Sequence, residues 1–328
     1  MVKVGIIGCG KIAQVRHIPE YLDNPNAKLT GLYDLNQQRA KDLAEKYGCR
    51  SYESIEDMLA DPEIDAVSVC AANHVHAEIT IAALKAGKHV LCEKPMATKL
   101  KDCQMMVDTA EQMGKKLMIG QNQRFAKAHV EARKLIQRGD IGNVLTFKTT
   151  FGHGGPETWS IDAGPQNWFF DKKRAAMGAM ADLGVHKTDL IQYLLNDTVE
   201  ETTAKVMTLD KKDSNGNLIG VDDNAICIYK MKSGIIGTMT ASWTYYGDVY
   251  KRQEEGAPVR LMNMMRIGSA VRQGVRYSIR LIAAALMAVL AAVYISYCSK
   301  ARRMERSYCT DRRSVIIQYI QHQDGSKG

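Results

Sequence analysis

A glycine-rich motif near the start of the chain is the first stretch whose residue types and spacing could do chemistry. It reads G-x-G-x-x-A and directly follows the apolar run 2–7. The first glycine permits a tight turn, the second lets the backbone approach a pyrophosphate, and Ala13 lets the following helix pack closely on the strand. The free N–H groups at the start of that helix then face the phosphates. We therefore expect dinucleotide contacts from Gly8, Gly10, Lys11 and Ile12.

An acidic residue stands where a second strand is predicted to end. Asp34 follows the run 29–33 and lies 24 residues after Gly10. A carboxylate at this position accepts hydrogen bonds from the hydroxyls of an adenosine ribose, and it repels a 2′-phosphate. No arginine immediately follows Asp34. The sequence therefore predicts NAD as the cofactor in preference to NADP, and the alternative is a turn with a solvated aspartate.

Two further predicted strands are followed by polar residues, and ligands bind at the carboxyl ends of strands in a doubly wound sheet. Asn73 could bond the ribose or carboxamide of the cofactor, while His76 either faces the cofactor or caps the next helix. Glu93 and Lys94 follow the strand 89–92, where two charges are costly to bury unless they are paired or used. The Lys94 ammonium could bond a substrate hydroxyl and stabilise a developing alkoxide. The alternative is a surface lysine beside a turn.

A carboxylate and an imidazole stand four residues apart at the start of a long predicted helix. Asp182 and His186 would project from one face of that helix. An imidazole can take a hydroxyl proton near neutral pH, so the pair predicts acid/base chemistry. Metal binding is the rival interpretation, but two ligands without a third nearby give it little support, and we expect no metal site.

The elements that must position these residues divide the body of the chain into two domains. Residues 1–121 alternate apolar runs with amphipathic stretches, a pattern typical of a parallel sheet covered on both faces by helices. Residues 122–253 combine helices with β-rich runs and a loop rich in Gly, Pro and Trp. The predicted fold class is α/β, with an N-terminal Rossmann dinucleotide-binding domain and a C-terminal α+β domain with an open, mostly antiparallel sheet. In that domain we expect helices at 128–138 and 179–195 and strands at 144–151, 224–231 and 235–243.

The last 75 residues, 254–328, differ from the body in composition. They carry 12 Lys and Arg against 5 Asp and Glu, which accounts for nearly all of the net charge of +8. The body is electrically ordinary, so we expect no nucleic-acid partner. A charge-free run at 281–299 could just span a bilayer, but its six alanines and two serines favour a buried or amphipathic helix, or a tail foreign to the domain. This part stays unassigned, and a membrane partner is not expected.

The cysteines and the start of the chain bear on its compartment. None of the eight cysteines forms a C-x-x-C pair, and Met1 leads straight into an apolar strand rather than a secretory signal. Reduced thiols in the cytoplasm are the predicted state.

Together these motifs resemble the glucose–fructose oxidoreductase / inositol dehydrogenase family (Gfo/Idh/MocA). The resemblance implies NAD(P)-linked oxidation or reduction of a sugar or cyclitol hydroxyl, and a second domain whose open sheet often forms the oligomer interface. It runs through G-x-G-x-x-A at 8–13, AGKHVLCEKP at 86–95, GQNQRF at 120–125 and DLGVH at 182–186.

The resemblance also implies roles for individual residues. Lys94 resembles the catalytic lysine of the family, Asp182 its substrate-binding carboxylate and His186 its acid/base. Asn73 and Glu93 stand where family members touch the nicotinamide end of the cofactor. Further expected contacts are to the cofactor from Asn122 and to the substrate from Arg124 at the domain junction. The aromatic face of Trp168 either lines the sugar pocket or packs in the core.

The resulting hypothesis is an NAD(P)-dependent oxidoreductase that transfers a hydride between nicotinamide and a hydroxyl carbon of a sugar, polyol or cyclitol. A homodimer or homotetramer is expected if the sheet is complete, although 254–328 lacks the strand pattern with which family members continue. Two alternatives stay open. One is an NAD-dependent glycoside-processing enzyme that works by transient oxidation and elimination, and the other is a non-catalytic cofactor-binding or membrane-tethered protein.

Overall fold

Six short apolar strands build a parallel sheet in the first half of the chain. The computed structural model describes residues 1–246, and the atypical segment 254–328, with its candidate membrane span, lies outside the described residues. The strand order is β3-β2-β1-β4-β5-β6, and every neighbouring pair is parallel. The strands are β1 (Val2–Ile7), β2 (Ala27–Tyr33), β3 (Arg50–Ser51), β4 (Ala66–Val69), β5 (His89–Cys92) and β6 (Leu117–Ile119).

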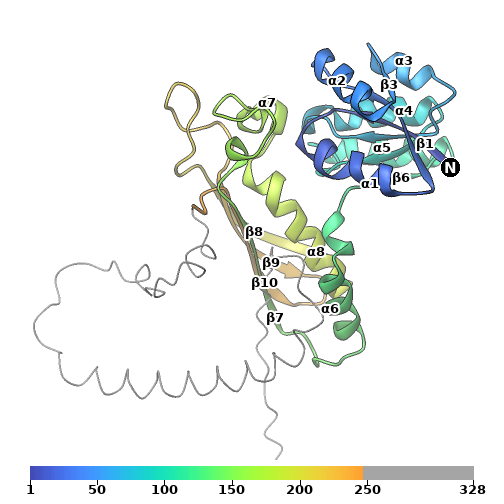
Figure 1. The fold of residues 1–328 in the computed structure, drawn as a ribbon. Coiled ribbons are helices and arrows are strands. Elements are labelled where there is room, and N and C mark those ends of the chain that lie inside the picture. Colours follow the sequence, from blue (N-terminus) through green and yellow to red (C-terminus); the bar gives the residue numbers. More distant parts are fainter. Residues whose placement is uncertain (247–328) are drawn as a thin grey trace, which may run out of the picture. The chain divides into compact units, whose positions relative to one another are not determined.

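Helices connect these strands (Figure 1). Apolar side chains of the helices and of the strands pack together in two core clusters. The strand order reverses between β1 and β4, so the carboxyl ends of these strands form the edge where a ligand crevice is expected. The predicted first helix is a π-helical turn, η1 (Ala13–His17), that continues into α1 (Ile18–Asp23). The other helices of this domain are α2 (Gln37–Tyr47), α3 (Ile55–Ala60), the short η2 (Asn73–Val75), α4 (His76–Lys85) and α5 (Leu100–Gln112).

The second sheet has four strands in the order β7-β10-β9-β8. It is mixed, because β7 pairs with β10 in parallel while the other two pairings are antiparallel. The sequence therefore predicted the antiparallel character correctly but missed the parallel pairing, which depends on a long connection. The strands are β7 (Thr146–Gly152), β8 (Val199–Met207), β9 (Asn224–Met231) and β10 (Ile236–Ser242).

Helices cover one face of this second sheet. The long helix predicted at 179–195 begins with a π-helical turn, η6 (Met180–Gly184), and continues as α8 (Val185–Leu195). Leu183 and Ile191 from this segment pack in one core cluster with Tyr229 and Trp243 from the sheet side. The remaining elements are η3 (Asn122–Phe125), α6 (Lys127–Gln137), η4 (Pro156–Thr158), η5 (Trp168–Phe170) and α7 (Lys172–Ala175).

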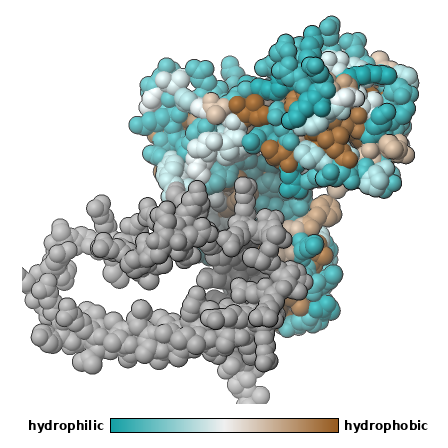
Figure 2. Space-filling model, in the orientation of Figure 1, coloured by the Kyte–Doolittle hydropathy of each residue, from teal (hydrophilic) through white to brown (hydrophobic). Residues whose placement is uncertain are grey.

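The outer strand β8 was not expected from the sequence. Its residues read VEETTAKVM and all but the two ends are exposed, so the alternation of apolar and polar side chains that marks a half-buried strand is missing. The face of β9 that points away from the core is also exposed, with Ile226 51% and Ile228 48% exposed. Over the described residues, Figure 2 shows a mainly hydrophilic surface on which hydrophobic atoms gather in patches.

Candidate active site

The glycine-rich loop between β1 and η1 is shaped by close backbone packing. Gly8 has a φ of +96°, and a Cβ there would lie 2.7 Å from the backbone of Cys70 at the end of β4. Gly10 differs, since no atom lies within 4 Å of the position its Cβ would take. The backbone at Gly10 is therefore open to the approach of another group. This open cradle beside a helix start fits the pyrophosphate of a dinucleotide.

Asp34 lies next to this loop at the end of β2. Its buried carboxylate accepts hydrogen bonds from Cys9 N at 2.7 Å and Asn36 N at 2.8 Å. These two bonds fix the carboxylate between the glycine-rich loop and the start of α2. Each oxygen can accept further bonds, so the group can still receive ribose hydroxyls.

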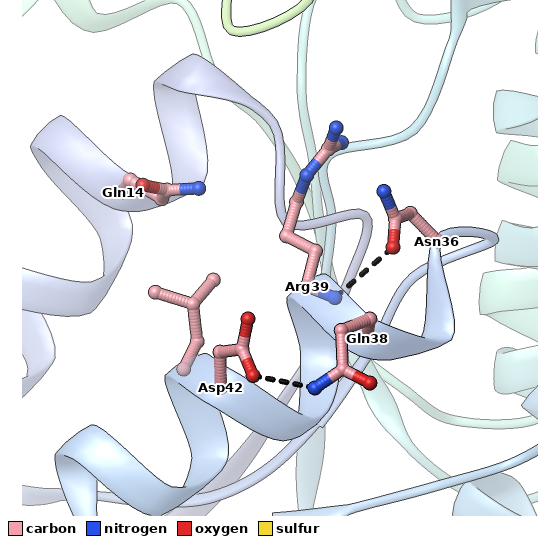
Figure 3. Close-up of a pocket in the computed structure, with 6 residues that line it drawn as sticks. Gln14, Asn36, Gln38, Arg39 and Asp42 are labelled. Carbon is pink, nitrogen blue, oxygen red and sulfur yellow. Dashed lines mark hydrogen bonds between the residues drawn. The ribbon is translucent and has the colours of Figure 1, made fainter.

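A cavity of about 340 Å³ opens beside Asp34, between η1 and α2. Arg39 lines this cavity (Figure 3). Its Nη1 lies 3.6 Å from Asp34 Oδ1 and its Nη2 lies 2.6 Å from Asp162 Oδ1. No arginine directly follows Asp34 in the sequence, but Arg39, five residues later on α2, has its guanidinium near the Asp34 carboxylate. The lining residues are Gln14, Asn36, Gln38, Arg39, Asp42 and Leu43.

Lys94 and Asp182 meet across the two domains. The Lys94 ammonium donates to Asp182 Oδ1 at 2.9 Å and to the Asp182 backbone carbonyl at 3.1 Å. Asp182 is buried, and burial alone would raise its pKa, but the charge of Lys94 and the nearby His153 outweigh that effect and lower it well below its usual range. The carboxylate is therefore ionised at any working pH.

His186 lies one helical turn beyond Asp182, at the start of α8, and is buried. Burial, followed by the charge of Lys94, lowers its pKa to about 3. The ring is therefore neutral at physiological pH, and its Nδ1 atom has no hydrogen-bond partner among the described residues. A neutral imidazole beside a paired ammonium can accept a proton from a hydroxyl group.

Two residues near Asp182 were missed by the sequence analysis. Trp243, fully buried just after β10, donates its indole N–H to Asp182 Oδ2 at 3.0 Å. His153, just after β7, places Nε2 3.7 Å from the same oxygen while its Nδ1 accepts from Gly155 N at 3.0 Å. Both are more than 25 residues from Asp182 in sequence, so no local spacing could have indicated them.

Three predicted cofactor contacts have their side chains engaged with the protein itself. Asn73 donates to the backbone carbonyl of Ala175 at 3.0 Å. His76 has both ring nitrogens on backbone carbonyls, at 2.7 Å and 3.0 Å, and is almost completely buried. Glu93 is also buried and turns its carboxylate towards His17. This geometry favours bracing of the crevice by these side chains over direct contact of the His76 ring with a cofactor.

The remaining predicted site residues are Arg124, Asn122 and Trp168. Arg124 forms a bidentate ion pair with Asp189 on α8, so its guanidinium is already engaged away from Asp182. Its neighbour Asn122 has no side-chain hydrogen bond within residues 1–246. Trp168 stacks on Phe169, with ring centroids 3.9 Å apart.

Residues 1–246 show neither a metal-binding cluster nor a membrane-spanning helix. They contain no group of three or more His, Cys, Asp or Glu side chains placed to hold a metal ion. Within the same range no helix is both long and apolar enough to cross a membrane.

Both domains match those of a known protein family. Residues 2–121 match the model of an oxidoreductase family with an NAD-binding Rossmann fold, and residues 129–254 match the GFO/IDH/MocA C-terminal domain. Glucose-6-phosphate 3-dehydrogenase of Bacillus subtilis is 32% identical over 248 residues, which cover 74% of this chain and 68% of that protein. Myo-inositol 2-dehydrogenase of Thermotoga maritima is 29% identical over 241 residues, 73% of this chain and 68% of that protein.

Solved structures of sugar oxidoreductases share this fold. Levoglucosan dehydrogenase in complex with NADH and levoglucosan has a TM-score of 0.67 at 27% identity, covering 75% of this chain and 68% of that one. Aldose-aldose oxidoreductase from Caulobacter crescentus, complexed with glycerol, has a TM-score of 0.66 at 28% identity, covering 74% of this chain and 71% of that one.

Proposed function

The chain belongs to the GFO/IDH/MocA family of oxidoreductases, and from this premise we propose that it is an NAD-dependent dehydrogenase of a sugar, polyol or cyclitol. The reaction moves a hydride between a hydroxyl-bearing carbon and nicotinamide. The observation that carries the proposal is the meeting of Lys94 with Asp182, one helical turn from His186. Two lobes thus supply an ammonium, a carboxylate and a neutral imidazole to one place.

Each of these residues has a defined task in the proposed reaction. A bound dinucleotide supplies the hydride acceptor or donor. His186 takes the hydroxyl proton, while the Lys94 ammonium bonds the oxygen that becomes an alkoxide and stabilises its charge. The negative charge that develops on that oxygen offsets the charge of Lys94 and so raises the proton affinity of His186 during the step. Asp182 holds Lys94 and offers acceptor oxygens to neighbouring hydroxyls.

The nucleotide end of the cofactor is assigned to the glycine-rich loop and to Asp34. The open space above Gly10 would take the pyrophosphate, with Gly8, Lys11 and Ile12 around the same turn. Asp34 favours NAD, because its carboxylate accepts ribose hydroxyls and repels a 2′-phosphate. Arg39 opposes part of that repulsion at 3.6 Å, so we propose a preference for NAD over NADP rather than exclusion of NADP.

The experiment is a screen for NADH formation on the full chain with glucose 6-phosphate, myo-inositol and levoglucosan, followed by Lys94→Ala on the best substrate. We expect turnover to fall by about two orders of magnitude or more while NAD affinity stays nearly intact. Lys99→Ala removes an exposed lysine five residues away and serves as the matched control. Equal turnover in Lys94→Ala and the parent would discard the assignment. Product formed without accumulation of NADH would instead favour transient oxidation and elimination.

We further propose that residues 1–121 bind the cofactor, that 122–253 bind the substrate, and that the open sheet face pairs two or more copies of the chain in the cytoplasm. The sheet face supports this because Ile226, Ile228 and Ile236 are each about half exposed on the adjacent strands β9 and β10. Light scattering on the purified chain tests the oligomer, and a monomer at micromolar concentration would contradict it.

A further inference from the structure

We propose that His17 is a positioning residue of the active site: it is the middle of a buried hydrogen-bonded chain, Tyr21–Ser68–His17–Glu93, that holds Glu93 against the backbone of Lys94. The proposal rests on the proposed function only in giving Lys94 its catalytic task. Nothing in the motif spacing indicated this chain, because His17 and Glu93 are 76 residues apart.

The atoms of the chain fit one consistent order of donors. His17 Nε2 lies 2.9 Å from Glu93 Oε1, His17 Nδ1 lies 3.3 Å from Ser68 Oγ, and Tyr21 OH lies 2.6 Å from the same hydroxyl. An ionised carboxylate can only accept, so Nε2–H must donate to Glu93. In a neutral ring Nδ1 then accepts from Ser68, and the Ser68 oxygen accepts from Tyr21. Burial raises the pKa of Tyr21, which keeps its hydroxyl proton available for this bond.

The hydrogen-bonded residues are shielded from water. Ser68 is fully buried, and His17 and Glu93 are 7% and 9% exposed. Water therefore cannot replace a partner that is lost, and an unpaired charge in such a place is costly. These hydrogen bonds join η1 and α1 to β4 and to Glu93, which directly follows β5, so the helix after the glycine-rich loop and the segment that carries Lys94 are fixed to each other.

The second oxygen of Glu93 reaches the lysine directly. Glu93 Oε2 accepts from the Lys94 backbone N–H at 3.1 Å. Gly120, just after β6, leaves room for the carboxylate, since a Cβ there would lie 3.2 Å from it. Lys94 is thus held at both ends, its backbone by Glu93 and its ammonium by Asp182 at 2.9 Å.

The charge of Glu93 depends on His17. Burial alone would raise the pKa of Glu93, but the hydrogen bond from His17, together with the charge of Lys94, outweighs burial and lowers the pKa below its usual value. The other titratable groups that act on Glu93 or feel its charge are Lys94, Cys70, Cys92, His76 and His186. Of these Lys94 is the cation, and it favours the same ionised state as His17 does. Without His17, only Lys94 opposes the effect of burial, so we expect the pKa of Glu93 to rise.

The experiment compares His17→Leu, which removes the donor, with His17→Gln, which keeps an amide N–H. Turnover on the best sugar substrate is measured against pH, together with the KM values for NAD and sugar. For His17→Leu we expect the acid limb of turnover to move up by about one pH unit or more, with KM for NAD changed less than about twofold, and for His17→Gln to restore most of the parent profile. The matched control is His89→Gln, at the other end of β5. A His17→Leu profile that superimposes on the parent would overturn the proposal.

A second measurement needs no turnover. In the parent, the lowered pKa of Glu93 adds stability that is present above the unfolded value of about 4.3 and lost as pH falls below it. In His17→Leu we expect the folded pKa of Glu93 to rise, so the melting temperature should fall behind that of the parent by an amount that grows as pH rises from about 4.3 towards neutral. Ser68→Ala, one link further from Glu93, should shift in the same direction by less. A difference in melting temperature between His17→Leu and the parent that does not change with pH would overturn the positioning role. Absence of turnover on every sugar would count only against the proposed function.

Discussion

Replacing Trp243 by phenylalanine tests whether Asp182 is held in place from the sheet side. The indole N–H donates to Asp182 Oδ2 at 3.0 Å, and the ring is fully buried against Phe169 and Phe170. Phenylalanine keeps an aromatic ring at this position and removes the donor. Lys94 still pairs with the other carboxylate oxygen, so the charge stays compensated while one restraint on its orientation is lost.

The magnitude follows from the type of bond. A hydrogen bond to a charged group contributes about 1.5–3 kcal/mol. Since each 1.36 kcal/mol is about tenfold in rate, a bond whose loss is felt fully in the transition state would lower kcat/KM by about ten- to a hundredfold. The smaller ring also loses packing contacts, which lowers the free energy of unfolding but should not discriminate between substrate and transition state.

A double-mutant cycle separates the two effects. Turnover is measured for Trp243→Phe, for Asp182→Asn and for the double variant, with Phe170→Leu as a neighbouring packing control. If Trp243 acts through the Asp182 carboxylate, the tryptophan substitution should cost less than about threefold once the charge is gone. Losses that multiply independently in the double variant would refute the reasoning, and so would a loss of turnover in Phe170→Leu as large as that in Trp243→Phe.

Two further predictions concern buried groups around the site. Lys187 is fully buried, donates to Gln123 at 2.8 Å, and has its pKa lowered to about 8 by burial. The folded chain therefore loses this proton at lower pH than the unfolded chain does, so the parent gains stability as pH rises from about 8 to 10. In urea unfolding, the free energy of unfolding of Lys187→Met should therefore lie closer to that of the parent at pH 7 than at pH 10. A difference that is the same at both pH values would contradict this prediction. Gly120→Ala places a methyl group 3.2 Å from the Glu93 carboxylate at a position without positive φ, so it should lower turnover through this contact and not through backbone strain. Equal turnover in Gly120→Ala and the parent would show that the carboxylate can move freely.

The parts that local spacing determines could be predicted from the sequence. The parallel sheet follows from alternating apolar and amphipathic segments, and the i, i+4 spacing places Asp182 and His186 one turn apart. The partners of these residues come from elsewhere in the chain. Trp243 is 61 residues from Asp182, and Lys94 is 88 residues from it, and only the fold brings them together.

Residue type alone does not give the direction in which a side chain points. Arg124 was expected to bind substrate, yet it pairs with Asp189 on the same helix that carries His186. A charged side chain at a domain junction lowers its free energy by finding the nearest opposite charge, and a sequence without coordinates does not say which charge that is. Trp168 was expected either at the sugar pocket or in the core, and its ring stacks on Phe169 in the structure; its contact with substrate stays a prediction.

The position of the catalytic helix depends on the sheet that it covers. Asp222 accepts from Gly178 N at 2.8 Å and Met180 N at 2.7 Å, which anchors the turn that precedes Asp182. A Cβ on Gly178 would lie 1.9 Å from the Asp222 carbonyl oxygen and 2.9 Å from the Trp243 ring, so only glycine fits between them. Asp182 is therefore fixed by the residues that start β9 and end β10, none of which is assigned to touch substrate. A change in the register of these two strands would move Asp182, and Lys94 with it, so turnover should respond to mutations in the sheet core before NAD affinity does.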